Sequence, residues 1–312
     1  QDEGDQNDLL RILLWCGGPA AALALGGGWW IMRRALNPVT ALTNAAERLN
    51  ERTLDQQLPR SGNGDELDRL TEVFNAMTAR LNQSFLRVHE FTLHASHELK
   101  TPLAVLHGEI ETELNDPATT PAQRELLLSR LDEIQRLTKI VDGLTLLTKA
   151  DAGQIKLNQE SVPLDELVRE AYEDVHVLAR ASQVKVLLTH CDKLTINGDR
   201  HRLRQLLLNL TDNAIKYNRP EGRLEISLAR EKDAAMLTLR NTTMGFDPQV
   251  LPRLFDRFYR GDPSHTNEVD GCGLGLSIAQ WIVSAHDGTI ALALDANQEI
   301  VVTVRLPLAR MA

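Results

Sequence analysis

Residues 91–103 read FTLHASHELKTPL, and this stretch decides how the rest of the chain is interpreted. The apolar residues around it recur at spacings of three and four: Val88, Ala95, Leu99, Leu103, Leu106 and Ile110. At roughly 100° per residue they form one stripe of a helix, and His97 falls about 160° from its middle, so we expect the imidazole to face water. A neutral imidazole beside an acid, here Glu98, suits a nucleophile. Taken alone, the pattern also fits an ordinary surface histidine.

Segment 96–103, SHELKTPL, resembles the H-box of membrane sensor histidine kinases, and the later motifs follow in that family's order. The resemblance implies that His97 takes the γ-phosphoryl group of ATP and passes it to an aspartate of a response regulator. It also implies that Glu98 is the acid–base neighbour and that Thr101 takes part in dephosphorylating the regulator. Thr101 lies one helical turn beyond His97, which puts both on one face. Pro102 is expected to bend the helix just past the site.

The composition excludes some classes of protein. A net charge of −9 and a pI near 5.5 argue against a nucleic-acid partner, which favours a basic surface. The three cysteines are Cys16, Cys191 and Cys272. Because none stands in C-x-x-C spacing, neither a zinc site nor a disulfide framework is indicated.

Residues 12–32, ILLWCGGPAAALALGGGWWIM, carry no charge over about 20 residues, which is long enough to cross a bilayer. Trp29 and Trp30 stand where an interfacial aromatic belt would lie, and Arg33 and Arg34 follow at once. The positive-inside rule therefore predicts that the chain is cytoplasmic after about residue 33. A buried soluble helix or a signal peptide is the alternative. The chain starts at Gln1 rather than Met. The resemblance implies that a first membrane span and a sensor domain lie upstream. It also implies that the protein is located in the bacterial inner membrane.

Between this segment and His97, the sequence predicts two amphipathic helices joined by a polar linker. Pro38 opens the first apolar pattern, the linker includes residues 59–64, and Glu66 stands at the start of the second pattern. This arrangement resembles a HAMP linker. An inert spacer is the alternative.

After a polar break at residues 115–117, a further helix carries apolar residues at spacings of three and four: Leu127, Leu131, Ile134, Leu137, Val141 and Leu144. Paired with the His97 helix it makes a hairpin, and two hairpins complete a four-helix bundle. None of these amphipathic helices can bury its stripe alone, so we expect a homodimer.

From about residue 160 onward, helical and strand patterns mix, which predicts an α/β sandwich. Helices are expected over 163–182, 200–218 and 273–286, and strands over 184–189, 224–229, 236–240, 289–294 and 300–306. On the helix over 200–218, the expected buried face is Leu203, Leu206, Leu207, Leu210, Ala214 and Tyr217.

A polar ridge lies on the flank of that helix, formed by Asn209, Asn213 and Lys216. Amide oxygens suit Mg²⁺ and an ammonium group suits phosphates, although a solvated polar edge is the usual explanation of such a ridge. Segment 209–217 resembles the N-box of the Bergerat-type ATP-binding domain. The resemblance implies that Asn213 holds the metal, and that Asn209, Lys216 and Tyr217 help to bind ATP.

Two further motifs follow in the family's order. Segment 255–260, FDRFYR, resembles the F-box, whose aromatic residues Phe255 and Phe258 would anchor a lid over ATP, with Arg260 beside them. Segment 271–276, GCGLGL, opens a helix, and its glycines let backbone N–H groups approach phosphate closely. The expected binding residues there are Gly271, Gly273, Leu274 and Gly275. A Rossmann site is the rival interpretation of such glycines, but no strand immediately precedes them.

One motif departs from the family pattern. Segment 241–245 reads NTTMG where the family has D-x-G-x-G. Asn241 replaces the aspartate that accepts from the adenine amino group, and its carbonyl oxygen can still accept. Gly245 matches the second glycine of the family pattern. Thr243 replaces the first glycine and adds a Cβ beside the base, so weakened ATP affinity is one expected consequence.

The sequence therefore predicts a multidomain sensor histidine kinase that uses ATP and Mg²⁺. The expected parts are an extracytoplasmic stub (1–8), a transmembrane helix (9–32), a HAMP-like helical bundle (33–85), a dimeric four-helix bundle for dimerisation and phosphotransfer (86–152) and an α/β sandwich ATP-binding domain (160–309). The first alternative is a non-catalytic or phosphatase-biased signalling scaffold with a decayed nucleotide site. The second is an ATPase of the gyrase and heat-shock chaperone group, against which the H-box and the HAMP-like linker argue.

Overall fold

The computed structural model describes residues 23–30, 32–33, 37, 40, 43–44, 57–60, 62, 64, 66–243, 245, 247–260 and 271–309. The chain divides into two compact units, Gln1–Val88 and His89–Ala312.

The predicted membrane segment is described only in its last third. Residues 23–30 are helical and exposed. Among the residues that the structure describes, no helix combines the length and the apolar character that a membrane span needs. The rest of the predicted span, and nearly all of the first HAMP-like helix, lie outside the described residues.

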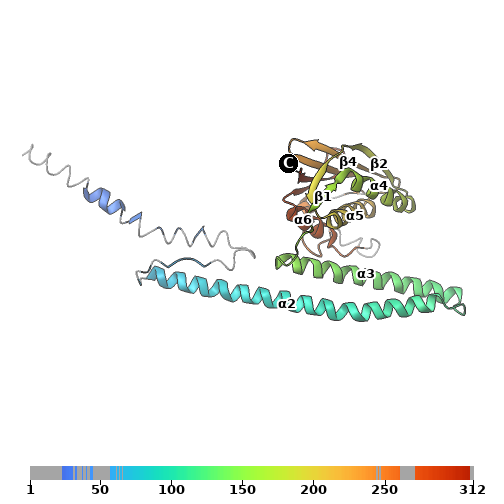
Figure 1. Ribbon diagram of the computed structural model, residues 1–312, viewed down its shortest axis with the longest axis horizontal. Coiled ribbons are helices and arrows are strands. Elements are labelled where there is room, and N and C mark those ends of the chain that lie inside the picture. Colours follow the sequence, from blue (N-terminus) through green and yellow to red (C-terminus); the bar gives the residue numbers. More distant parts are fainter. Residues whose placement is uncertain are drawn as a thin grey trace, which may run out of the picture. The chain divides into compact units, whose positions relative to one another are not determined.

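Helix α2 runs from Glu66 to Leu114 without interruption (Figure 1). The domain boundary predicted near residue 85, between the HAMP-like bundle and the phosphotransfer bundle, falls inside this helix. No glycine or proline stands between Glu66 and Thr101, so nothing breaks the backbone ladder of hydrogen bonds at that boundary. Pro102 removes one N–H donor, but the helix continues past it for three further turns.

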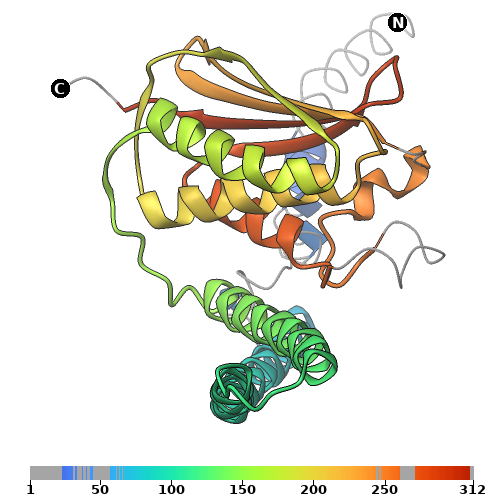
Figure 2. The same cartoon turned by 90° about the vertical axis from the view of Figure 1, so that its right-hand side faces the viewer.

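Helix α3, Pro121–Asp151, begins with a complete capping box. The Thr120 hydroxyl accepts from the Gln123 backbone N–H, and the Gln123 side chain accepts from the Thr120 backbone. From His89 onward, α2 lies antiparallel beside α3 (Figures 1 and 2), and Lys100 Nζ lies 2.8 Å from Asp142 Oδ1. Much of the predicted stripe on α2 stays exposed in the single chain, with Leu99 53% and Leu106 45% exposed.

The remaining elements form the α/β domain. They are β1 (Glu160–Pro163), α4 (Leu164–Ala181), β2 (Lys185–Cys191), β3 (Thr195–Gly198), α5 (Arg200–Lys216), β4 (Arg223–Glu231), β5 (Ala234–Asn241), the 3₁₀ helix η1 (Pro248–Arg253), α6 (Gly275–Ala285), β6 (Thr289–Leu294) and β7 (Ile300–Pro307). The main sheet has the order β2-β4-β5-β7-β6, with β2 parallel to β4 and the other pairs antiparallel. Helices α4, α5 and α6 cover one face of this sheet (Figure 2).

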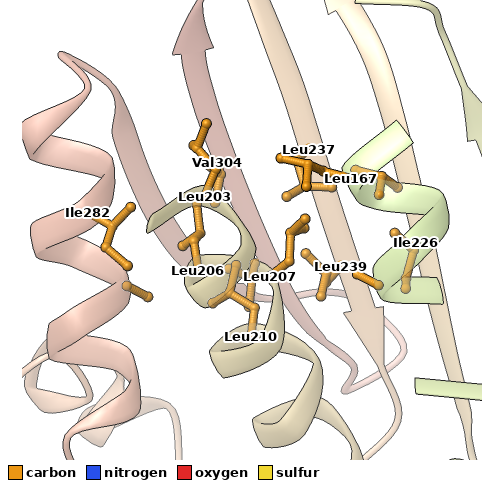
Figure 3. Packing of buried hydrophobic residues seen from close by; sticks show 14 of the residues in the cluster. Leu167, Leu203, Leu206, Leu207, Leu210, Ile226, Leu237, Leu239, Ile282 and Val304 are labelled. Carbon is orange, nitrogen blue, oxygen red and sulfur yellow. The ribbon is translucent and has the colours of Figure 1, made fainter. Parts of the chain in front are cut away.

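The core fills the space between these helices and the sheet (Figure 3). Strand β5 alternates buried and half-buried side chains, because successive residues of a strand point to opposite faces. Leu237 and Leu239 of β5 therefore point to the helical side of the sheet, in the same core cluster as Leu206 and Leu210 of α5, each 2% exposed or less. The predicted α/β sandwich is confirmed.

The structure differs from the sequence expectations at two places in this domain. The two-stranded antiparallel sheet of β1 and β3 is not predicted, because each strand has only four residues. Tyr217 is 41% exposed rather than buried, whereas the other five residues of the predicted α5 face are buried. Helix α5 ends at Lys216, so Tyr217 is the C-cap residue and leaves the helical face.

A buried histidine joins two helix ends. The ring of His286, just after α6, accepts a hydrogen bond at Nε2 from the Asp199 backbone N–H over 3.0 Å. Its Nδ1 lies 2.7 Å from the Ile282 carbonyl oxygen and donates to it, because Nε2 is the acceptor. The Cβ of any larger residue at Gly198 would overlap this ring.

Candidate functional site

The H-box residues occupy one exposed side of α2. His97 is exposed, as its position on the helix predicts, and Ser96 beside it is buried and donates through Oγ to the Thr92 carbonyl oxygen over 2.7 Å. His97 and Thr101 line one shallow hollow, together with Lys100. The helix therefore presents the imidazole and the threonine hydroxyl on the same side, open to an approaching partner.

A separate cleft of about 1140 Å³ lies in the α/β domain and extends to α3. It gathers most of the predicted nucleotide-binding residues: Asn209, Asn213, Lys216, Tyr217, Asn241, Gly245, Arg260, Gly271, Gly273, Leu274 and Gly275. Phe255 and Phe258 are not in its lining. His97, Glu98 and Thr101 do not line it either.

Helix α5 supplies the polar wall of the cleft. The Nδ2 atom of Asn209 is buried and has no hydrogen-bond partner in the described part of the chain. Lys216 Nζ lies 2.6 Å from Asp212 Oδ2, one turn back on the same helix. A Cβ at Gly275 would lie 3.4 Å from Asn213 Nδ2, so the glycine loop passes directly over this asparagine. An unsatisfied buried donor costs about 1–3 kcal/mol, which favours a ligand atom at Asn209.

Asn241 stands at the end of β5, 3% exposed. Its Nδ2 donates to the Thr242 carbonyl oxygen over 3.0 Å, which leaves Oδ1 as an acceptor. The Thr242 hydroxyl donates to Asn218 Oδ1 and accepts from the Arg223 backbone N–H. Asn218 Nδ2 in turn donates to the Ala214 carbonyl oxygen. This buried network fixes the backbone at the end of β5 where Thr243 lines the cleft.

The F-box and the glycine loop touch through their backbones. The Phe258 N–H donates to the Gly273 carbonyl oxygen over 2.9 Å. Phe258 has φ of 61° and Gly273 has φ of 69°. A Cβ at Gly273 would lie 2.8 Å from the Phe258 carbonyl carbon, so only glycine fits this approach. A left-handed conformation is costly for an aromatic residue, and such strain persists only where surrounding contacts enforce it.

The N-terminus of α5 carries a perturbed carboxylate. Burial alone would raise the pKa of Asp199, but hydrogen bonds from the backbone N–H groups of Arg202 and Asn158 outweigh it and hold the pKa below its usual value. This N-cap anchors the helix that carries the N-box. In the part of the chain described here, no three His, Cys, Asp or Glu side chains gather as a metal site.

Sequence reasoning misses several residues that shape the cleft. Asn218 and Thr242 form the buried network, but nothing in their spacing links residues that lie 24 positions apart. Gly143 of α3 lines the cleft and lies against Leu274. A lone glycine within a helical pattern is a signal that could have found it, because a glycine there often marks close packing.

Comparison with known proteins matches three stretches of the chain to protein families. Residues 198–310 match the histidine kinase-, DNA gyrase B- and HSP90-like ATPase family, residues 87–153 match the His Kinase A (phospho-acceptor) domain, and residues 30–83 match the HAMP domain.

Several curated sensor proteins are similar over most of the chain. The sensor protein CutS of Streptomyces coelicolor is 32% identical over 288 residues, which cover 92% of this chain and 69% of CutS. The probable sensor protein PcoS of Escherichia coli is 33% identical, covering 89% of this chain and 59% of PcoS. The histidine-protein kinase BaeS of Escherichia coli is also 33% identical, covering 93% of this chain and 62% of BaeS. The chain thus spans about three fifths of the length of PcoS and BaeS.

Solved structures agree with these similarities. Full-length ShkA in complex with AMPPNP matches with a TM-score of 0.62 at 25% identity, over 72% of this chain and 46% of ShkA. The histidine kinase AdeS of Acinetobacter baumannii matches in fold with a TM-score of 0.50 at 24% identity, over 69% of this chain and 98% of that structure. With an exposed histidine on the phospho-acceptor helix and a separate cleft in an ATPase-type domain, the chain belongs to the sensor histidine kinase family.

Proposed function

We propose that this protein is an ATP-dependent protein-histidine kinase. It phosphorylates itself on His97 and then passes the phosphoryl group to an aspartate of a response regulator. The observation that carries this proposal is the cleft of the α/β domain, which gathers the N-box, the end of β5 and the glycine loop around one volume. The similarity to the AMPPNP complex of ShkA supports a nucleotide in this cleft.

The residues present fit ATP. Asn209 offers a buried donor that lacks a partner among the described residues, and Lys216 offers a cation at the same wall. Oδ1 of Asn241 remains an acceptor for the adenine amino group, since Nδ2 is held by the Thr242 carbonyl. This arrangement argues for a functioning variant site rather than the decayed site of the scaffold alternative.

The same wall fits Mg²⁺. Mg²⁺ is commonly held by one or two protein oxygens together with substrate phosphates and water, and the Asn213 amide oxygen lies beside the glycine loop. When bound, the ion would neutralise charge on the phosphates.

The reaction requires positioning more than covalent help from the protein. A nitrogen of His97 forms a bond to the γ-phosphorus while the bond to the bridging oxygen breaks and ADP leaves. Glu98, the next residue, takes up the imidazole proton. In the second reaction the N–P bond breaks and an aspartate oxygen of the regulator takes the phosphoryl group. Thr101, on the same side of α2 as His97, is proposed to act in dephosphorylating the regulator.

We further propose that the protein works as a homodimer in the bacterial inner membrane. Exposed apolar residues on both helices of the hairpin, such as Leu99, Leu106 and Leu126, support pairing with a second copy. The uncharged stretch within residues 9–32 and the arginines that follow it support one span, with the later residues in the cytoplasm.

Incubation of the full chain with γ-labelled ATP and Mg²⁺ tests the proposal. His97→Gln should abolish labelling while leaving ATP binding intact, and the label on the native protein should be acid-labile, as expected of a phosphoramidate. Asn213→Ala should reduce labelling by about a hundredfold, because the phosphates lose their oxygen-bound cation. Calorimetric titration with an ATP analogue separates the alternatives: no binding at millimolar ligand would reject the kinase and favour the scaffold.

A further inference from the structure

Asn241 lines the cleft with an amide group, whose two ends are chemically different. A carboxylate has two equivalent acceptor oxygens, whereas the asparagine side chain has one acceptor, Oδ1, and one donor, Nδ2. At position 6 of the ring, adenine carries an amino group that donates, and a 6-oxo purine such as hypoxanthine carries an oxygen that accepts. The orientation of the Asn241 amide therefore decides which class of purine it can pair with.

The carbonyl group of Thr242 fixes this orientation. Asn241 Nδ2 donates to the Thr242 carbonyl oxygen over 3.0 Å, and Asn241 is only 3% exposed. If the amide turned over, Oδ1 would lie against that carbonyl oxygen, and two acceptors cannot form a hydrogen bond. A buried polar atom without its partner lowers the stability of the folded state. The amide therefore keeps Nδ2 on Thr242, which leaves Oδ1 for a ligand in the cleft.

Thr242 is itself held by several hydrogen bonds. Its hydroxyl donates to Asn218 Oδ1 and accepts from the Arg223 backbone N–H over 2.9 Å. Its own backbone N–H donates to the Arg223 carbonyl oxygen over 3.2 Å. A Cβ at Gly222 would overlap both Asn218 Oδ1 and Thr242 Oγ1, so only glycine fits beside this network. These contacts hold the Thr242 carbonyl group in one place.

An ion pair connects the same network to the next strand of the cleft wall. Arg223 Nη2 lies 3.0 Å from Glu299 Oε1, and the Glu299 side chain is only 7% exposed. Glu299 precedes Ile300, which lines the cleft and pairs with Asn241 between β5 and β7. The network therefore joins β4, β5 and β7 around Asn241.

The second departure from the family pattern supports the same arrangement. Thr243 stands where the family has a glycine, and its nitrogen belongs to the peptide group of the Thr242 carbonyl. Glycine adopts more backbone conformations than threonine does, so threonine restricts the rotations that would move this carbonyl away from Asn241. The two departures are complementary, because an amide needs a fixed partner and Thr243 helps to fix it.

We propose that Thr242 and Asn218 are positioning residues that set the purine selectivity of the cleft, because they keep Asn241 Oδ1 available to the base. The site then favours a 6-amino purine over a 6-oxo purine, whose oxygen would face Oδ1 with no hydrogen between them. The inference rests on the proposed kinase function, which places a nucleotide in this cleft. An aspartate at this position would need no such positioning, because both of its oxygens accept.

Calorimetric titration of the full chain with ADP and with inosine diphosphate, each with Mg²⁺, measures this selectivity without phosphoryl transfer. The two bases differ at position 6 and at the adjoining N1. The native protein should bind ADP about tenfold to a hundredfold more tightly, the range expected when a buried acceptor loses its donor. Thr242→Val should lower this ratio about threefold or more, because the carbonyl loses the hydroxyl that fixes it and the amide can turn. Thr242→Ser keeps the hydroxyl and should keep the ratio.

The Asn241→Asp background separates positioning from a general structural role. In that background Thr242→Val should leave the preference for ADP unchanged, because a carboxylate accepts in either orientation. The matched control is Thr238→Val, the same change on the same strand at a residue outside the cleft lining, and it should keep the native ratio. Asn218→Ala removes the acceptor of the Thr242 hydroxyl and repeats the test if circular dichroism shows that Thr242→Val does not fold.

The possible failures of this inference and of the kinase function can be told apart. Equal affinity of the native protein for ADP and inosine diphosphate would overturn the selectivity and leave the kinase function untouched. An unchanged ratio in Thr242→Val and Asn218→Ala, or an equal fall with and without Asn241→Asp, would overturn the positioning role. If the native protein binds neither nucleotide at millimolar concentration, the proposed kinase function fails, and this inference fails with it.

Discussion

The ATP-binding domain and the helical hairpin differ in how completely each buries its own apolar side chains. In the domain, Leu203 and Leu206 of α5 are each 1% exposed. In the hairpin, Leu106 of α2 and Leu126 of α3 are 45% and 53% exposed. Apolar residues recur at spacings of three and four in both regions, so this spacing alone does not tell whether the partner surface lies in the same chain. The domain completes its core within the same chain, with Leu146 and Leu147 of α3 as part of it, whereas the hairpin leaves apolar side chains exposed in the single chain.

A large-to-small change in the domain should have the largest effect on stability. Leu206→Ala should lower the free energy of unfolding by about 2–5 kcal/mol, because it removes a fully buried side chain and leaves a cavity. Thermal unfolding of the full chain, followed by circular dichroism, measures the loss. A change below 1 kcal/mol would contradict a self-contained core at this position.

A charge introduced among the exposed apolar residues of the hairpin should weaken the association of two copies rather than the stability of one chain. Leu106→Glu should weaken dimerisation at least tenfold, because a carboxylate would be buried without a partner between two copies. Sedimentation velocity at several protein concentrations measures the change. Glu90→Gln is the control, since helical spacing puts residue 90 on the opposite side of α2 from Leu106. Unchanged dimerisation would show that another surface joins the two copies.

Helix caps offer a matched pair of changes in the two regions. Asp199→Ala in the domain and Thr120→Ala in the hairpin should each cost about 1 kcal/mol at pH 7. Only the cost of Asp199→Ala in free energy of unfolding should depend on pH. Because the pKa of Asp199 is lowered in the folded protein, its contribution is complete above the unfolded value of about 3.9 and is lost as the pH falls through the lower folded value. The difference between native protein and Asp199→Ala, measured from pH 7 to pH 3, should therefore shrink at the acidic end. A difference that grows toward acid would contradict this sign.

The smallest effect on stability is expected at the exposed side of the hairpin. Thr101→Ala should change the free energy of unfolding by less than about 0.5 kcal/mol, since the side chain is exposed. It should nevertheless slow dephosphorylation of the regulator more than autophosphorylation. Release of phosphate from a phosphorylated regulator, compared with His97 labelling, separates the two activities. Equal loss of both would indicate that Thr101 only supports the helix.

Sequence patterns predict the long elements and the local motifs well, and they fail where residues far apart meet. The five strands of the main sheet and the helices beside it follow from periodicity, because each buries one face against a common core. Strands β1 and β3 are too short to show a period. The change of motif near residue 85 does not end a helix, because no glycine or proline interrupts α2 there. The N-box side chains come together on one helix and are predictable, whereas the contact between Gly143 and Leu274 depends on how α3 meets the domain.

The side chain of His286 makes the two kinds of hydrogen bond that a backbone peptide group makes. Its ring offers one donor and one acceptor, as a backbone amide does, and places them between the end of α6 and the start of α5. Only the neutral ring with its proton on Nδ1 completes both bonds, so the two ring nitrogens must differ in chemical shift as a protonated and an unprotonated nitrogen do. In an ¹⁵N NMR spectrum, this one residue would report whether the joint between the two helices is closed, without any probe added to the protein.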